Sequence, residues 1–582
     1  MKKIFNFKKS TLTAIVVLVV SISCKDSFLD VPPTGSLGEI QLQSKSGVEG
    51  ALIGAYAILN AKGYSRLGAP NNWVYGSIMG GEANKGTDPG DYTPINPIQR
   101  YEVDPTNGDV NDTWRPKYEG VSRSNAAIRL ATASTQISAN DKKSVIAQAR
   151  FLRGHYYFEL KKLFNNVPYI DETQDYGKGI EKIKASPAFW DKIEADFKHA
   201  YDNLPVTQSQ IGRVNKWAAG SYLAKAYLFQ GKFAQAKTLF DEIIANGQTS
   251  NGKKYALVPS FPQVFNAEND NHEESVFALQ SSMNTQNVNN SNWFDDLNYP
   301  YNTGPDGPGN CCGFFQPSFS LGNAYRTQAG LPLLNGSYNN EANVLKTDYN
   351  VRSSVAFVED AGTVDPRLDF TIGRRGIPYL DWREHPGQDW IRSQVYAGPY
   401  SPKKFVYYRR QENTLTDGSS WTRGYATMNF NIIRFADVLL MAAEAEIEAG
   451  SLEKAREYTN LVRSRAANKA SWVKEYNAPT QNAANYDISN YTAAWTDKAV
   501  ARSAVRMERM LELAQEGHRF FDLVRWGTAE VEIGIYLAYD SKILVAKLGG
   551  AKFIKGKNEY LPIPQTQIDL QGKDVLPQNP GY

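Results

Sequence analysis

Two acidic side chains, Asp381 and Glu384, lie three residues apart on either side of Trp382. A glycosidase uses such a pair, with one carboxyl as general acid and the other as base or nucleophile. The two groups must face each other across a cleft, and a chain with 61 acidic residues brings carboxylates together by chance. The sequence also lacks the G-x-S-x-G, Walker A and H-E-x-x-H motifs. We therefore predict that the protein is not an enzyme.

Other reactive side chains also favour structural roles. His518 and its charged neighbours sit in an aromatic-rich helical stretch, where such groups lock helix packing. The acidic run at 268–274 has oxygen ligands that suit calcium but lacks the spacing of an EF-hand loop, so we predict a solvated turn and no cofactor. We interpret Cys311 and Cys312 as two partly buried small residues in a Gly- and Pro-rich loop. A disulfide between them is the alternative, because an exported protein meets an oxidising compartment.

The first residues have the pattern of an export signal. Residues 1–10 are basic, and residues 11–22 are apolar but shorter than the roughly 20 residues that span a bilayer. The segment ends in Ser21-Ile22-Ser23-Cys24, which resembles a bacterial lipobox and implies lipid on Cys24; ordinary secretion is the alternative. Removing its four lysines from a net charge of +3 leaves −1, which does not indicate a nucleic-acid partner.

The body of the chain is predicted to be mostly α-helical. Helical periodicity covers residues 45–60, 110–165, 186–246, 431–467 and 495–527. Two helix pairs share the pattern Gly-x-[Phe/Leu]-x-x-Ala at their turn, once at Gly231 and once at Gly450, which is typical of a tetratricopeptide-type hairpin. Because the repeats are dispersed, the intervening segment must fold back onto this helical scaffold.

We divide the chain into five segments on these signals. They are a lipoprotein signal peptide (1–23), a lipidated Cys24 with a tether (24–44), an N-terminal helical part (45–250), a loop-rich lobe (251–430) and a C-terminal helical part (431–582).

Several blocks resemble the SusD/RagB family of nutrient-binding lipoproteins. They are WRPKYEGVSRSNAAIRL at 114–130, AQARFLRGHYYFELKKLFNNVP at 147–168, GRVNKWAA at 212–219, DPRL at 365–368, IRFADVLLMAAEA at 433–445, RMERMLELAQEGHRFFDLVRW at 506–526, YLPIP at 560–564 and QNPGY at 578–582. The blocks occur in order behind the lipobox. The resemblance implies a SusD-like fold built on tetratricopeptide-type hairpins, with a ligand site in loops.

That implied site points to two aromatic-rich stretches, 73–101 and 290–425. Flat rings cover the apolar face of a sugar, and polar side chains pair its hydroxyls. The candidate ligand-binding side chains are Trp73, Tyr75, Tyr92, Trp293, Phe294, Tyr299, Tyr301, Trp382, Arg383, Trp390 and Trp421. Tyr379, Tyr396, Asp389 and Arg392 lie among them. The alternative is that the rings build small cores in the lobe; Trp293 and Tyr92 are the favoured contacts.

The resemblance implies a function in nutrient uptake. We expect a lipid-anchored protein at the outer membrane, facing the exterior, that binds oligosaccharide and delivers it to a SusC-like TonB-dependent transporter. An oligopeptide-binding protein of the RagB kind is the alternative within the binding class. A tetratricopeptide-type adaptor that binds only proteins is a third hypothesis, against which the lipobox weighs.

Overall fold

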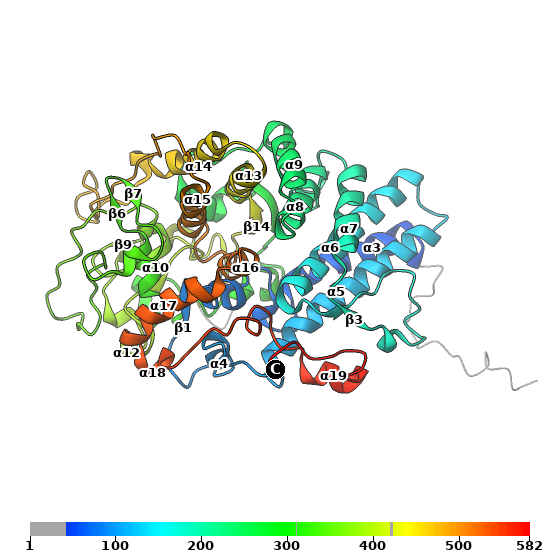
Figure 1. Ribbon diagram of the computed structural model, residues 1–582, viewed down its shortest axis with the longest axis horizontal. Helices are drawn as coiled ribbons and strands as arrows, with labels where there is room; N and C mark the ends of the chain where they lie inside the picture. The colour runs from blue at the N-terminus through cyan, green and yellow to red at the C-terminus, as the bar shows by residue number, and fades with distance from the viewer. Residues whose placement is uncertain (1–41, 310, 420–422) are drawn as a thin grey trace, which may run out of the picture.

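Long helices form a scaffold along one side and the middle of the molecule (Figure 1). The computed structural model describes residues 42–309, 311–419 and 423–582. The predicted signal peptide, Cys24 and most of the tether lie outside these ranges. The scaffold helices are α3 (Lys45–Ala57), α5 (Gly108–Ala133), α6 (Ala139–Phe164), α7 (Trp190–Asn203), α8 (Lys216–Phe229), α9 (Phe233–Asn246), α13 (Phe435–Ala449), α14 (Leu452–Ala466) and α15 (Lys498–Glu512).

Successive scaffold helices pack against each other from α5 through α9. The next partner of α9 is α13, although the whole loop-rich segment separates them in sequence. The series then continues through α14, while α15 packs on both α13 and α14. The predicted fold class is confirmed: the structure is mostly α-helical, and the loop-rich segment leaves the helical scaffold and returns to it.

Local sequence signals explain where these helices begin and why they pack closely. The Asn215 side chain caps α8 by accepting from the Ala218 N–H at 2.9 Å, and Ser451 caps α14 directly after the turn at Gly450. A Cβ at Gly120 of α5 would overlap the ring of Tyr156 on α6. This contact is the close approach that small residues allow between paired helices.

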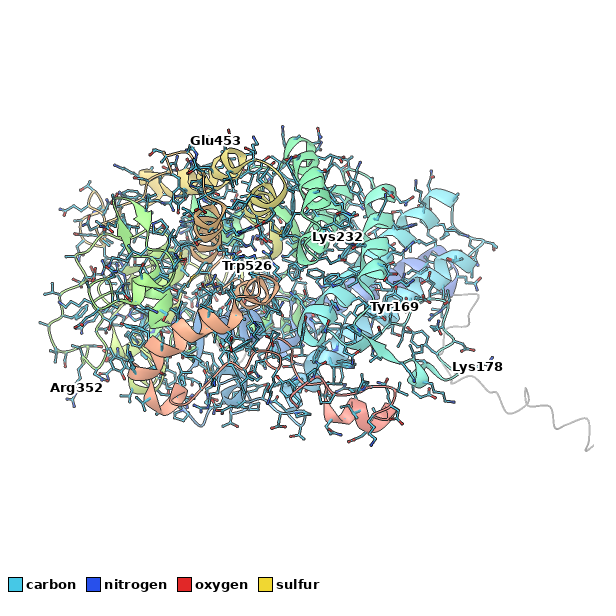
Figure 2. The ribbon with its side chains drawn as sticks, in the orientation of Figure 1. Tyr169, Lys178, Lys232, Arg352, Glu453 and Trp526 are labelled. Carbon is cyan, nitrogen blue, oxygen red and sulfur yellow. A yellow bond between two sulfur atoms is a disulfide. The ribbon has the colours of Figure 1, made fainter. Side chains whose placement is uncertain are left out.

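Short helices complete the chain around the scaffold. They are α4 (Ile95–Gln99), α10 (Phe319–Ala324), α11 (Leu368–Thr371), α12 (Gln394–Ala397), α16 (Arg519–Arg525), α18 (Val545–Leu548) and α19 (Gln565–Gln571), with the longer α17 (Ala529–Ile543) beside α16. Figure 2 places Trp526, just after α16, near the middle of the view, with Arg352 towards the outer end of the lobe and Lys178 towards the opposite end of the molecule. Within the described residues, no helix is both long and apolar enough to cross a membrane.

The strands form two-stranded antiparallel pairs. The longer ones are β1 (Ala83–Gly86) with β5 (Phe314–Pro317) and β4 (Ser275–Leu279) with β14 (Phe430–Arg434). The short ones are β2 (Val167–Pro168), β3 (Ala185–Ser186), β6 (Thr327–Gln328), β7 (Leu331–Pro332), β8 (Ile372–Gly373), β9 (Pro378–Tyr379), β10 (Arg383–Glu384), β11 (Ser401–Pro402), β12 (Thr416–Asp417) and β13 (Tyr425–Ala426). Pairing β4 with β14 joins the two ends of the loop-rich segment, because Ser275 lies opposite Arg434.

A buried network of charged side chains lies where these two ends meet. Its members are the cations Arg367, Lys404, Arg434, Arg463 and Arg465 and the carboxylates Asp365, Glu274, Glu508, Glu512 and Glu516. Arg434 is central: its guanidinium lies 2.7 Å from Glu274, 2.6 Å from Glu512 and 2.7 Å from Glu516. The network ties the lobe to α14 and α15.

Electrostatics keep this network ionised. Burial alone would raise the pKa of the Glu512 carboxyl, but Arg465, Arg434 and Arg367 hold its pKa well below the usual value. Burial lowers the pKa of Lys404 to about 8, against the opposing effect of Glu516. Each of these side chains therefore stays ionised only while its ion-pair partners remain in place.

We predict that Arg434→Met destabilises the protein by roughly 3–5 kcal/mol, because three carboxylates would stay buried without their shared cation. Urea unfolding of residues 25–582, followed by circular dichroism, measures the change. The matched control is Lys198→Ala, which breaks an exposed ion pair with Asp202 at 2.8 Å and should cost less than about 1 kcal/mol. Equal unfolding midpoints for the two variants would contradict the prediction.

Candidate ligand-binding site

The loops that contain Asp88, Tyr301 and Arg392 meet Arg66 at one exposed surface. Its charged and aromatic members, here called the loop-junction surface, are Arg66, Asp88, Asp91, Tyr92, Tyr301 and Arg392. All six side chains are partly exposed. The two aromatic stretches that the sequence singled out, 73–101 and 290–425, are therefore brought together in space.

The backbone around Gly313 joins these segments. The Thr87 N–H donates to the Gly313 carbonyl at 2.6 Å, and the Gly313 N–H donates to the Tyr299 carbonyl at 2.9 Å. Two residues further on, the Tyr301 N–H donates to the Trp390 carbonyl at 2.9 Å. Gly313 has a φ of +76°, and a Cβ there would lie 3.3 Å from the Tyr301 Cβ. Glycine therefore suits the point at which the loops converge.

Arg392 is the best-held polar group of the loop-junction surface. Its guanidinium lies 2.7 Å from Asp88 and 2.5 Å from Asp91, and donates to the Thr87 hydroxyl at 2.9 Å. The same group lies over the Tyr301 ring, 5.3 Å from its centroid. Because several partners fix it, the guanidinium and two carboxylates offer oriented donors and acceptors to a hydroxylated ligand.

Tyr92 provides the most exposed aromatic side chain of the loop-junction surface, with an exposed fraction of 36%. Its hydroxyl donates to Asp109 Oδ1 at 2.8 Å, and its ring meets Phe314 edge-on at 6.5 Å. Burial, then the nearby Asp109 carboxylate, raises the pKa of Tyr92, so the phenol stays protonated. Arg66 lies nearby, pairs with Asp296 at 2.5 Å and covers the ring of Trp293 at 5.6 Å.

Most of the other predicted contacts are core residues. Trp73, Tyr75 and Phe294 are no more than 1% exposed and belong to the main hydrophobic core. Tyr299, Tyr379, Trp382 and Trp390 form a separate core of the lobe, each no more than 3% exposed. The prediction is wrong for these residues, because a ring packed on both faces cannot stack on a sugar. The alternative interpretation, small cores in the lobe, describes the second group correctly.

The remaining predicted residues fall outside the loop-junction surface or at its border. Trp293 is 8% exposed beneath Arg66, and Tyr396 is 7% exposed. Arg383 is exposed and lies 3.6 Å from Asp306, and Asp389 is exposed without a contact to this surface. Trp421 lies outside the described residues. Sequence reasoning missed Arg66, Asp88 and Asp91; the turn-forming stretch Asp88-Pro89-Gly90-Asp91 was the available signal.

Groups that could have done chemistry have structural partners. Asp381 accepts from the backbone N–H of Arg409 at 2.5 Å and of Arg410 at 3.3 Å, so it holds a turn. Burial lowers the pKa of His518 to about 4, within a helix-packing environment. Cys311 and Cys312 form a disulfide, so the alternative interpretation of this pair applies.

The acidic run at 268–274 does not converge on a common point. Glu268 pairs with Arg410 at 2.8 Å, whereas Asp270 accepts from the Asn429 N–H at 3.1 Å. Glu274 enters the buried network instead. The predicted solvated turn is therefore wrong for Glu274, which is fully buried because two arginines pair with it.

A groove of about 570 Å³ between α5 and α19 is a second candidate location. Tyr64, Trp114 and Tyr118 lie along it. Trp114 is buried, the Tyr118 hydroxyl donates to the Pro168 carbonyl at 2.6 Å, and Arg115 covers Tyr64 at 4.9 Å. None of the lining residues of the groove belongs to the two predicted stretches.

Comparison with known proteins decides the family. A model described as "SusD family" matches residues 273–582, and one described as "Starch-binding associating with outer membrane" matches residues 27–228. The chain belongs to the SusD family. The SusD/RagB resemblance is thereby confirmed, and the second description associates such proteins with the outer membrane.

Relatives of this SusD-family chain extend over nearly its whole length. SusD-like protein P25 of Formosa agariphila is 25% identical over 89% of this chain and 90% of its own. SusD-like protein P2 of the same organism is 25% identical over 99% of this chain and 100% of its own. These curated relatives are SusD-like proteins by name.

Solved structures share the fold of this SusD-family chain. A laminarin-binding SusD-like protein is 22% identical, with a TM-score of 0.64 over 93% of this chain and 100% of its own. A surface glycan-binding protein A of Bacteroides thetaiotaomicron, solved with laminarihexaose, is 19% identical, with a TM-score of 0.62 over 92% of this chain and 99% of its own. At these identities the similarity establishes the fold alone.

The strand that leads into Asp88 and Asp91 starts beside a buried carboxyl, Glu82. Burial raises the pKa of Glu82 to about 7, and its Oε2 accepts from the Gln515 N–H at 3.0 Å. The folded protein therefore keeps a proton that the unfolded chain loses near pH 4.5. The stability contributed by this protonated group is present below that pH and is lost as pH rises towards 7.

We predict that Glu82→Gln gains stability relative to the unmodified protein as pH rises from 5 to 8. The gain should reach roughly 2–3 kcal/mol, because glutamine keeps the acceptor but never ionises. Chemical unfolding at several pH values measures the difference, with Glu341→Gln, a substitution of an exposed acid, as the control. A difference that stays constant across this pH range would contradict the prediction.

Proposed function

We propose that the protein binds oligosaccharide at the loop-junction surface and delivers it to a SusC-like TonB-dependent transporter in the outer membrane. The observation that carries the proposal is the arrangement of Arg392, bracketed by Asp88 and Asp91 above Tyr301. An oriented guanidinium, two carboxylates and exposed ring surface are the groups that recognise a hydroxylated sugar. Family membership supports a binding role, and structural neighbours named for laminarin and laminarihexaose binding support a glycan as ligand.

The charge of the loop-junction surface favours a ligand without strong negative charge. Arg66 and Arg392 are each already paired with a carboxylate. An anionic sugar would have to displace these partners, whereas neutral hydroxyls can donate to Asp88 and Asp91 and accept from Arg392. We therefore expect binding of neutral oligosaccharides, without turnover.

We predict that Tyr301→Ala and Arg392→Ala each weaken oligosaccharide binding at least tenfold, which corresponds to about 1.4 kcal/mol. Calorimetry on residues 25–582 would use laminari-oligosaccharides first, then other neutral oligosaccharides and a protein digest. Tyr476→Ala is the matched control, because Tyr476 is 52% exposed and lies outside the loop-junction surface.

The outcomes separate the hypotheses. Oligosaccharide binding that survives both substitutions would move the site elsewhere, with the α5–α19 groove as the next location. Binding only to peptides would contradict the glycan proposal and favour the RagB-like alternative. Release of shorter products from any oligosaccharide would contradict the prediction that the protein is not an enzyme.

We also propose that lipid on Cys24 anchors the protein to the outer membrane with its binding surface outward. Two or more acyl chains hold a protein on a membrane where one chain binds only reversibly. Cys24→Ser in the full-length chain should therefore move the protein to the soluble fraction and abolish labelling with radioactive palmitate. The control is the double variant Cys311→Ser/Cys312→Ser, which should remain in the membrane fraction. Membrane retention and labelling of Cys24→Ser would contradict the anchor.

A further inference from the structure

Four buried side-chain oxygens behind the loop-junction surface have no hydrogen-bond donor among the described residues. They are the Oδ1 atoms of Asn71, Asn292 and Asn298 and the Oδ2 atom of Asp295. Each of these residues is at least 94% buried, since their exposed fractions are 2%, 2%, 6% and 5% in the same order. Isolated unpaired acceptors occur in many proteins, but here three amide oxygens and one oxygen of the carboxylate that they surround are all unpaired.

The side chains meet at Asp295. The side-chain N–H groups of Asn71 and Asn298 donate to Asp295 Oδ1, at 2.9 Å and 3.0 Å. Asn292 belongs to the same turn, because the Asp295 N–H donates to the Asn292 backbone carbonyl at 3.4 Å. Two distant parts of the chain, one before residue 72 and one at 292–298, thus contribute to a single cluster.

In the part of the chain that the structure describes, no cation pairs with Asp295. Arg66 pairs with Asp296 rather than with Asp295, and Asp296 also accepts from the Tyr425 hydroxyl at 3.0 Å. A carboxylate in this position needs either a proton or a positive charge beside it.

Turning the asparagine amides changes what the cluster can bind. The oxygen and nitrogen of an amide side chain are interchangeable in shape, so either can face a neighbour. With the amides of Asn71 and Asn298 turned, their oxygens would lie about 3 Å from Asp295 Oδ1. Oxygens that share one calcium ion at 2.3–2.6 Å, in its usual coordination of six to eight, lie about that far apart.

We propose that Asn71, Asn292, Asp295 and Asn298 bind a hard cation of the calcium class. Carboxylate and amide oxygens are ligands that calcium accepts in flexible geometry, whereas magnesium keeps more of its water. The ion would cross-link the segment at Asn71 to the turn that carries Trp293 and Asp296. Because Asp296 holds Arg66, the cation would also stiffen one wall of the loop-junction surface. The site goes beyond the proposed function and stands whether or not the ligand is a glycan.

Terbium luminescence tests the site directly, because Trp293 lies next to Asn292 in sequence and can sensitise a bound Tb³⁺ ion. Residues 25–582, stripped with EDTA, should give a saturable luminescence signal that excess Ca²⁺ displaces. Adding Ca²⁺ should also raise the melting temperature. Trp293→Phe should lose most of the luminescence but keep the calcium-dependent rise in melting temperature.

Asp295→Asn, compared with a control variant, tests whether calcium binds at this cluster. Asp295→Asn keeps the shape of the side chain but removes its charge, so calcium affinity should fall at least tenfold. Asp306→Asn removes an exposed carboxylate of the same lobe and should leave calcium affinity unchanged. The proposal is overturned if the stripped protein shows no calcium effect, which would mean that water fills the cluster. Equal calcium affinity in Asp295→Asn and the unmodified protein would also overturn it.

Discussion

Burial of the ten charged side chains in the network centred on Arg434 constrains the whole molecule. An ion taken out of water is tolerated only where counter-charges and hydrogen bonds surround it. Here the partners come from both ends of the loop-rich segment, from α14 and from α15. Arg367 and Lys404, from the interior of that segment, complete the network. The lobe must therefore dock on the helices in one arrangement, since any other leaves buried charges unpaired.

This constraint positions the loop-junction surface. The loop-junction surface is built from loops on the docked segment and from the loop that follows β1, whose strand pairs with β5. Backbone hydrogen bonds at Gly313 and the ion pairs of Arg392 hold these loops together. A surface fixed before the ligand arrives loses less conformational entropy on binding. These loops therefore form a surface that is held in place although little regular structure supports it.

Much of the scaffold could be predicted because its signals are local. Helical periodicity, the cap at Asn215 and the turn at Gly450 each depend on residues close in sequence. Glu512 and Glu516 are four residues apart, and this spacing indicates ion pairs across packed helices. Their partners Arg367 and Lys404 could not be named, because they come from parts of the chain without helical periodicity.

The loop-junction surface, where we propose binding, was predicted only as two stretches of sequence. Tyr92 and Tyr301 lie partly exposed there, whereas Trp73, Tyr75 and Trp382 have the same aromatic character and are buried. Composition cannot separate these cases, because burial of a ring depends on which distant segments pack over it. Asp88 and Asp91 form ion pairs with Arg392, a residue about 300 positions away that becomes their neighbour only on folding.

The sequence by itself determined the family, the helical scaffold and the turns between paired helices, because these depend on short-range patterns and on ordered motifs. Tertiary structure alone decided which aromatic side chains remain exposed, which carboxylates bracket Arg392 and where the acceptors around Asp295 gather. The physical reason is the same in each case. Solvent exposure and charge pairing are properties of segments that are far apart in the chain and become neighbours only on folding.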